Sequence, residues 1–183
     1  FKGARLTRCV FKETALDGAV FSGATLERTL FQGAKGKGLD FKGANLERVR
    51  SMKNSVLTGA DFSGADLRRA GLRDTDFSET VFKDCDMGGA LLEKCRLVRA
   101  DFYHLKAVRA RFTKCDLESA SMRGANLFMA SLRKSRLVQT DLTGSNLYGV
   151  DFYKAVVGKT VFDAANLKKS MLEKRIGYLE EKE

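Results

Sequence analysis

The chain has 183 residues, carries 33 Lys and Arg against 23 Asp and Glu for a net charge of +10, and contains neither Pro nor Trp. Apolar residues make up 44% of it and are spread along its length, which excludes a disordered chain. No run approaches the ~20 apolar residues that a membrane-spanning helix needs. Because the chain begins at Phe1 and shows no basic-then-apolar signal segment, we expect a fragment of a larger protein.

Apolar residues recur with a period of five, which is neither the 3.6 of a helix nor the 2 of a strand. From Met52 to Leu172 all 25 residues at this spacing are apolar, and the residue two positions before each of them is usually small. The other three positions are mostly polar or charged. The N-terminal part repeats in the same way through Leu6, Phe11, Leu16, Phe21, Leu26, Phe31, Gly36, Phe41 and Leu46.

This period predicts a chain that turns a corner every five residues and closes a square coil of twenty. The central residue of each pentad, position i, and the small residue at i−2 then both point inward. Twelve of the 17 glycines lie at i+2, where a corner with positive φ favours Gly. Successive coils would pair through backbone hydrogen bonds about 4.8 Å apart, a ladder that Pro would interrupt.

Residues 60–64, 65–67 and 125–127 read Ala-Asp-Phe-Ser-Gly, Ala-Asp-Leu and Ala-Asn-Leu, and they match the motif A(D/N)LXX. On these motifs, nearly the whole chain resembles the pentapeptide-repeat proteins. The resemblance implies an all-β fold, a right-handed quadrilateral parallel β-helix of about eight to nine coils, which makes a rod about 40 Å long. We expect this β-helix to span residues 1–169.

Three irregularities interrupt the pattern. The register moves by one residue between Leu46 and Met52, and we place the extra residue, as a bulge, at Val49. Gly36 leaves a central position empty and is followed by an oversized Leu39. The pair Leu105 and Ala107 reverses the usual small-then-large order, and we interpret both cases as packing with compensated volume.

Residues 170–183 leave the pattern. Ser170 and Glu173 have the spacing of a capping box, and Leu172, Ile176 and Leu179 form one helical stripe. We expect a short C-terminal capping helix that covers the open end of the last coil. A dimerisation helix is the alternative, so a dimer through this segment stays open.

No constellation of residues indicates catalysis, a metal site or a cofactor, and we expect a protein that is not an enzyme. The only histidine, His104, is placed at an outer corner. Cys95 and Cys115 lie one coil apart and are expected to be free thiols rather than a disulfide. All four cysteines occupy small inward positions: Cys9, Cys85, Cys95 and Cys115. One face carries a column of carboxylates that belongs to the repeat motif: Asp40, Asp61, Asp101 and Asp141.

Positive charge gathers on two neighbouring faces, each with a net charge of +6. The charges form two columns at i+2, namely Lys94, Lys114, Lys134, Lys154 and Lys174 on one face, and Arg8, Arg28, Arg48 and Arg69 with Arg109 on the next. Two interpretations stay open. The columns are either a solvated surface that keeps a rod soluble or a docking stripe for an acidic partner.

Aromatic residues lie beside these columns. Phe128 and Tyr148 are one coil apart at i+1, with Met129 at the neighbouring corner, and Tyr153 occupies i+1 on the adjacent face. We expect these side chains to be exposed and to act as anchors of a protein interface.

The favoured function is therefore a protein-interaction scaffold or adaptor with an acidic protein partner. Residues 145–152 and 166–169 resemble the terminal repeat segments of bacterial type VI secretion accessory proteins, which implies a bacterial cytoplasmic role in secretion or effector delivery. Sequence-independent binding of nucleic acid through the basic faces is one alternative. The family also implies protection of gyrase by DNA mimicry, which the net charge of +10 disfavours because a DNA mimic is acidic.

Overall fold

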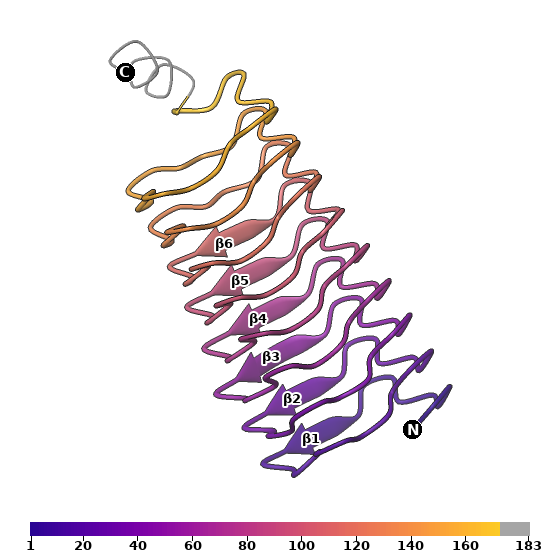
Figure 1. Ribbon diagram of the computed structural model, residues 1–183. Helices are drawn as coiled ribbons and strands as arrows, with labels where there is room; N and C mark the ends of the chain where they lie inside the picture. Colours follow the sequence, from indigo (N-terminus) through magenta and orange to yellow (C-terminus); the bar gives the residue numbers. More distant parts are fainter. Residues whose placement is uncertain (173–183) are drawn as a thin grey trace.

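The computed structural model describes residues 1–172, apart from the side chains of residues 51–53. The chain winds into a stack of four-sided coils, and the first and last described residues lie at opposite ends of the stack (Figure 1). One side of the stack is a parallel sheet of six short strands in chain order, with partners about one coil apart. The strands are β1 (Val10–Lys12), β2 (Leu30–Gln32), β3 (Arg50–Lys53), β4 (Gly71–Arg73), β5 (Leu91–Glu93) and β6 (Arg111–Thr113).

The other three sides are held by single parallel bridges, such as Arg5 with Thr25, Ala15 with Lys35 and Val20 with Asp40. Among the described residues the model contains strands and turns and no helix. The predicted square coil of twenty residues is therefore confirmed.

The pentad centred on Phe62 shows how the backbone amides are used. The N–H groups of Asp61, Phe62 and Gly64 donate to carbonyls of the neighbouring coils at 2.7–2.8 Å. Ala65 closes the corner by donating to the Phe62 carbonyl at 2.9 Å, and the Ser63 N–H donates to Oδ1 of Asp61 at 2.9 Å. The ladder and the corner thus use four of the five amides, and the aspartate at i−1 accepts the fifth. This division explains both the motif A(D/N)LXX and the absence of Pro.

Every i+2 corner for which a dihedral is recorded has a positive φ, whichever residue occupies it. Twelve of these corners are glycines, as predicted, and twenty-two are other residues with φ between 49° and 61°. Corners closed by the hydrogen bond from i+3 to i have the form of a type II turn, which requires positive φ at its third residue. The coil geometry imposes this conformation even where a side chain makes it less favourable.

The interior is a set of stacked side chains. On one side Phe21, Phe41, Phe62, Phe82 and Phe102 are each less than 1% exposed, and neighbouring rings lie 4.5–5.1 Å apart at interplanar angles of 4–17°. The coil spacing sets this offset stack, which adds aromatic contact energy to the burial of apolar surface.

The extra residue lies within β3 and not at Val49. Leu30 pairs with Arg50 at the regular spacing of twenty, whereas Gln32 pairs with Lys53 at twenty-one, so the register shifts inside the strand. Val49 keeps the ordinary inward position and is fully buried, while Arg50 is exposed. The apolar side chain stays in the core and the bulge begins after it, which keeps the charge of Arg50 in solvent.

Two other irregularities compensate in volume, as predicted. A Cβ added at Gly36 would lie 2.6 Å from Cδ1 of Leu39, so the large side chain fills the space that the missing one leaves. Leu105 and Ala107 are both fully buried in their reversed order.

The predicted capping helix over 170–183 lies almost wholly outside the described residues. Ser170, Met171 and Leu172 form a bend and a turn, and Leu172 is buried.

Gly36→Ala should lower the free energy of unfolding by about 1–3 kcal/mol, because the new Cβ would also lie 2.9 Å from the carbonyl carbon of Leu16. Leu39→Ala should cost about 2–5 kcal/mol through the cavity that it leaves. Since the two side chains compete for one space, the double variant should lose at least about 0.5 kcal/mol less than the sum of the single variants. Urea denaturation measures all three, and additive losses would show that Leu39 does not occupy the space at Gly36.

Candidate partner-binding surface

The side that carries β1–β6, together with the corners before and after it, is the most basic surface of the rod. It contains sixteen Lys and Arg and four Asp and Glu. We call this surface the basic face. It comprises residues 8–13, 28–33, 48–54, 69–74, 89–94, 109–114, 129–134, 149–154 and 169–172.

The predicted lysine column lies along one edge of the basic face. Its four described members are all exposed corner residues with positive φ: Lys94, Lys114, Lys134 and Lys154. Among the described residues none of the four forms a salt bridge, and Glu93, the residue before Lys94, pairs with Arg73 instead. The sequence also placed Lys174 here, and that residue lies outside the described part of the chain. The column therefore presents uncompensated positive charge.

Other faces of the rod neutralise their charges locally. Arg136 forms salt bridges with Asp116 at 3.6 Å and with Glu118, and the Glu118 carboxylate raises the pKa of the Arg136 guanidinium. Arg96 lies 3.6 Å from Asp76 on the same side. The lysine column thus differs from the surfaces beside it in lacking such partners among residues 1–172.

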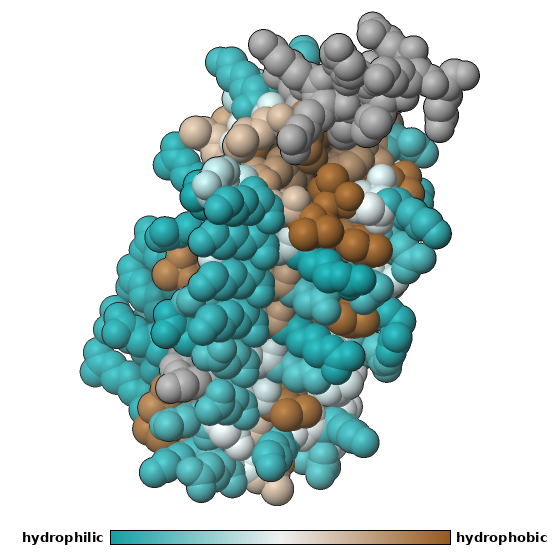
Figure 2. All heavy atoms as spheres, turned by 90° about the vertical axis from the view of Figure 1, so that its left-hand side faces the viewer, coloured by the Kyte–Doolittle hydropathy of each residue, from teal (hydrophilic) through white to brown (hydrophobic). Residues whose placement is uncertain are grey.

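The predicted arginine column lies along the other edge, where Arg8, Arg28, Arg48, Arg69 and Arg109 occupy corners with positive φ. Arg28 approaches Glu27 at 3.5 Å and Arg48 approaches Glu47 at 3.7 Å, so these glutamates partly relieve the repulsion within the column. Figure 2 shows a flank of the rod that is mainly hydrophilic, with hydrophobic residues gathered towards its C-terminal end.

The structure brings Phe128 and Tyr148 together but does not expose them fully. Their rings stack at 5.3 Å with an interplanar angle of 12°, and the ammonium of Lys169 lies 5.4 Å from the centre of the Tyr148 ring. Both side chains are half-buried, so the prediction that they are exposed was wrong. The stacking itself is the reason, because each ring covers one surface of the other.

Met129 and Tyr153 are the exposed members of the predicted aromatic cluster, at 50% and 38% of their surface. The Arg133 guanidinium lies 4.5 Å from the centre of the Tyr153 ring, and the Lys154 ammonium lies 5.3 Å from it. Tyr153 therefore stands within the basic face beside the lysine column, while Phe128 and Tyr148 form a separate stack around the corner.

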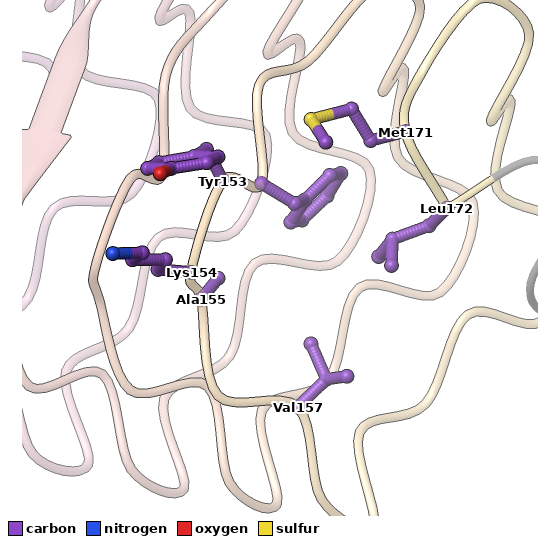
Figure 3. Close-up of a pocket in the computed structure, with 7 residues that line it drawn as sticks. Tyr153, Lys154, Ala155, Val157, Met171 and Leu172 are labelled. Atoms are coloured by element: carbon purple, nitrogen blue, oxygen red, sulfur yellow. The ribbon is translucent and has the colours of Figure 1, made fainter.

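A hollow of about 420 Å³ lies next to Tyr153 at the C-terminal end of the described chain (Figure 3). The sequence did not indicate it, because the hollow joins residues from two successive coils. Its lining consists of Phe152, Tyr153, Lys154, Ala155, Val157, Met171 and Leu172.

The aspartate column on another side is used by the fold itself. Asp40, Asp61, Asp101 and Asp141 each accept the N–H of the residue two positions later, at 2.9–3.0 Å. Three of them also meet a cation, in the pairs Lys42–Asp61, Lys83–Asp101 and Arg123–Asp141. The column is therefore not a free acidic surface.

The remaining candidates for chemistry occupy structural positions. All four cysteines are free, and burial raises the pKa of the Cys85 thiol to about 12. His104 lies at an exposed corner, as predicted, stacked on Tyr103 with ring centres 3.8 Å apart. Within residues 1–172, no group of three His, Cys, Asp or Glu side chains could hold a metal ion, and no helix is long and apolar enough to cross a membrane.

The fold and this surface define the class of the molecule, a rod-shaped repeat protein whose functional groups are columns of surface side chains. The chain belongs to the pentapeptide-repeat family. Eight copies of the family's pattern, described as "Pentapeptide repeats", match residues 1–33, 15–50, 51–84, 95–128 and 120–157. Among the curated proteins, none matches this chain.

Solved structures of pentapeptide-repeat proteins are similar to it. A trypsin-treated variant of QnrB1, "a plasmid-mediated fluoroquinolone resistance protein", is 18% identical with a TM-score of 0.50, over 94% of each chain. Rfr23 from the cyanobacterium Cyanothece 51142 is 23% identical with a TM-score of 0.42, over 70% of this chain and 91% of its own. HetL from the cyanobacterium Nostoc sp. Strain PCC 7120 is 20% identical with a TM-score of 0.36, over 93% and 90%. The likeness to QnrB1 supports the fold alone.

Asp61 should make the stability of the rod depend on pH. Partial burial alone would raise the pKa of this carboxyl, but hydrogen bonds from Ser63 and Lys42 outweigh it and hold the pKa below the ordinary value of 3.8. The ionised group therefore contributes stability that is present above pH 3.8 and is lost as the pH falls through its lowered native pKa.

Asp61→Asn keeps an oxygen that accepts the Ser63 N–H and removes the charge. Its free energy of unfolding should fall less steeply than that of the wild type between about pH 4 and about pH 2. Asp163→Asn, which changes an exposed carboxylate on the same side, is the control and should follow the wild type. Urea denaturation at several pH values measures the three slopes, and equal slopes for wild type and Asp61→Asn would contradict the assignment.

Proposed function

We propose that this protein is a non-enzymatic interaction scaffold that binds an acidic protein partner along its basic face. The observation that carries the proposal is the lysine column, four exposed ammonium groups without a salt bridge among the described residues. Like charges about one coil apart repel by about 1 kcal/mol per neighbouring pair in water. A partner with a row of carboxylates would remove that repulsion and gain affinity from it.

The rigidity of the rod supports this proposal. Its inward positions are filled by apolar side chains, and its backbone amides are hydrogen-bonded in the ladder. A partner therefore contacts mainly the side chains on the surface of the rod. Tyr153 and Met129 add exposed aromatic and thioether surface beside the charges. Anchors of this kind, surrounded by charge, are typical of protein interfaces.

Binding of nucleic acid is the second candidate, because the same lysine column would neutralise phosphates. If the partner is a protein, it should stay bound to the rod at moderate salt and after nuclease treatment. DNA mimicry is disfavoured, because the aspartates that would imitate phosphates are committed to backbone amides and to cations of the rod.

The finer role in bacterial type VI secretion or effector delivery, in the cytoplasm, rests on the resemblance of residues 145–152 and 166–169. It remains a prediction, and the identity of the partner decides it. A dimer through the C-terminal segment likewise remains a prediction.

Reversing two charges in the lysine column should strongly weaken binding of the partner. We expect Lys114→Glu/Lys134→Glu to reduce partner retention about tenfold or more at about 150 mM salt, because two attractive contacts become repulsive. Lys35→Glu/Lys37→Glu makes the same change of charge on another side of the rod and should leave retention within about twofold.

The measurement is affinity capture from nuclease-treated lysate, quantified by mass spectrometry for each variant. Retention of one stoichiometric protein by wild type and control, and its loss with the column variant, is the expected result. Equal loss in both variants would refute the role of the column. Recovery of nucleic acid alone, with binding that collapses as salt rises, would replace the protein partner by the second candidate.

Removal of aromatic surface tests the interface by a different interaction. Tyr153→Ala should weaken binding of the same partner by about 1–2 kcal/mol, whereas Tyr103→Ala, which removes a similarly exposed ring from another side, should not. Phe128→Ala/Tyr148→Ala should lower affinity and also cost stability, because this pair is half-buried and stacked. Titration calorimetry with the purified partner measures affinity, and unchanged affinity in both Tyr153→Ala and the double variant would exclude the aromatic contact.

A further inference from the structure

Near the N-terminal end, the basic face contains a groove of about 640 Å³, and the described side chains that line it are four arginines: Arg8, Arg28, Arg48 and Arg50. Three of them belong to the arginine column and lie in successive coils, so their backbones are separated by about 4.8 Å. Four guanidinium groups therefore border one small concave space.

The coil geometry does not require arginine at this corner. Arg8, Arg28 and Arg48 adopt φ values of 60°, 55° and 54°, in the region where Gly is least strained. Later coils place Gly89 and Gly149 at the same corner, with φ values of 67° and 66°. Arginine at this corner of the first three coils is therefore a property of the sequence and not a requirement of the backbone.

The fourth arginine comes from the irregularity in β3. Arg50 occupies the first position of that strand, opposite Leu30 of β2, and it is exposed. The equivalent positions of the neighbouring strands are Val10, Leu30 and Gly71. A charged residue therefore joins the groove at the coil where the chain departs from its repeat.

The nearby glutamates do not fill the groove. Glu27 and Glu47 approach Arg28 and Arg48 most closely at Nε, at 3.5 Å and 3.7 Å, and neither glutamate lines the groove. Mutual repulsion of four guanidinium groups favours an anion between them. The planar fork of each guanidinium suits the oxygens of phosphate, with charge-assisted hydrogen bonds of about 2.7–2.9 Å.

We propose that this arginine groove is a binding site for an oligophosphate, a chain of two or three linked phosphate groups. The intervals between Arg8, Arg28 and Arg48 offer two places in which one phosphate contacts the guanidinium groups of two successive coils, and Arg50 closes the side. Because the described side chains that line the groove are arginines alone, the site recognises the phosphate chain and not an attached base. The groove belongs to the basic face, but it lies apart from the lysine column that carries the scaffold proposal, since Lys114 and Lys134 lie on the opposite edge of that face and further along the rod, and the two proposals are therefore tested by different variants.

The test is isothermal titration calorimetry of the 183-residue chain at about 150 mM salt, with tripolyphosphate, pyrophosphate, orthophosphate, ATP and citrate as separate ligands. Tripolyphosphate should bind at one site per chain and at least about tenfold more tightly than orthophosphate, because it spans more than one arginine interval. Equal affinities for ATP and tripolyphosphate would assign the site to the phosphate chain alone. Tighter binding of ATP than of tripolyphosphate would show that the site also recognises the nucleoside, and it would overturn the assignment to the phosphate chain.

The chain provides a matched pair of variants. Arg48→Gln/Arg50→Gln removes two charges from the groove and should weaken tripolyphosphate binding about tenfold or more. Arg109→Gln/Arg111→Gln makes the same substitutions at the equivalent corner and strand positions three coils away, outside the groove, and should change affinity by less than about twofold.

Equal weakening in the two double variants, binding of citrate as tight as that of tripolyphosphate, or no binding at all would overturn the proposal. Thermal unfolding confirms that each variant is folded. If Arg48→Gln/Arg50→Gln does not fold, Arg8→Gln/Arg28→Gln takes its place. This variant removes two charges from the other end of the groove and should also weaken tripolyphosphate binding about tenfold or more.

Discussion

The structure depends on one constraint, the hydrogen-bonded ladder that joins each coil to the next at a spacing of about twenty residues. The ladder uses the amides at i−1, i and i+2, and the corner uses the amide that follows. The remaining amide has no backbone partner, so an aspartate or asparagine at i−1 accepts it. Where aspartate or asparagine stands at i−1, backbone pairing thus explains the residue type as the apolar core explains the central residue.

The same ladder gives the surface its character. Residues one coil apart lie about 4.8 Å from each other, so any residue type repeated at this spacing becomes a column. Opposite charges in a column or across it form salt bridges, as between Arg73 and Glu93. Like charges accumulate potential along the rod, and on the basic face this produces an edge of lysines and an edge of arginines.

Departures from the repeat coincide with the two surfaces of greatest interest. The extra residue in β3 places Arg50 beside the arginine column, and a hollow lies beside Tyr153 where the repeat pattern ends. A strictly regular rod offers repeated columns and little concavity. The groove and the hollow of this rod both lie at coils that depart from the repeat.

The five-residue period by itself determined the fold, the inward positions, the corners and the members of each charged column, because the side-chain direction in such a coil follows from position alone. The compensation of Gly36 by Leu39 could also be predicted, since inward volumes must add up. Only the tertiary structure decided that Phe128 and Tyr148 cover each other, that the bulge lies in β3 and not at Val49, and that four arginines share one groove. These features depend on rotamers and on contacts between coils, which a linear pattern does not specify.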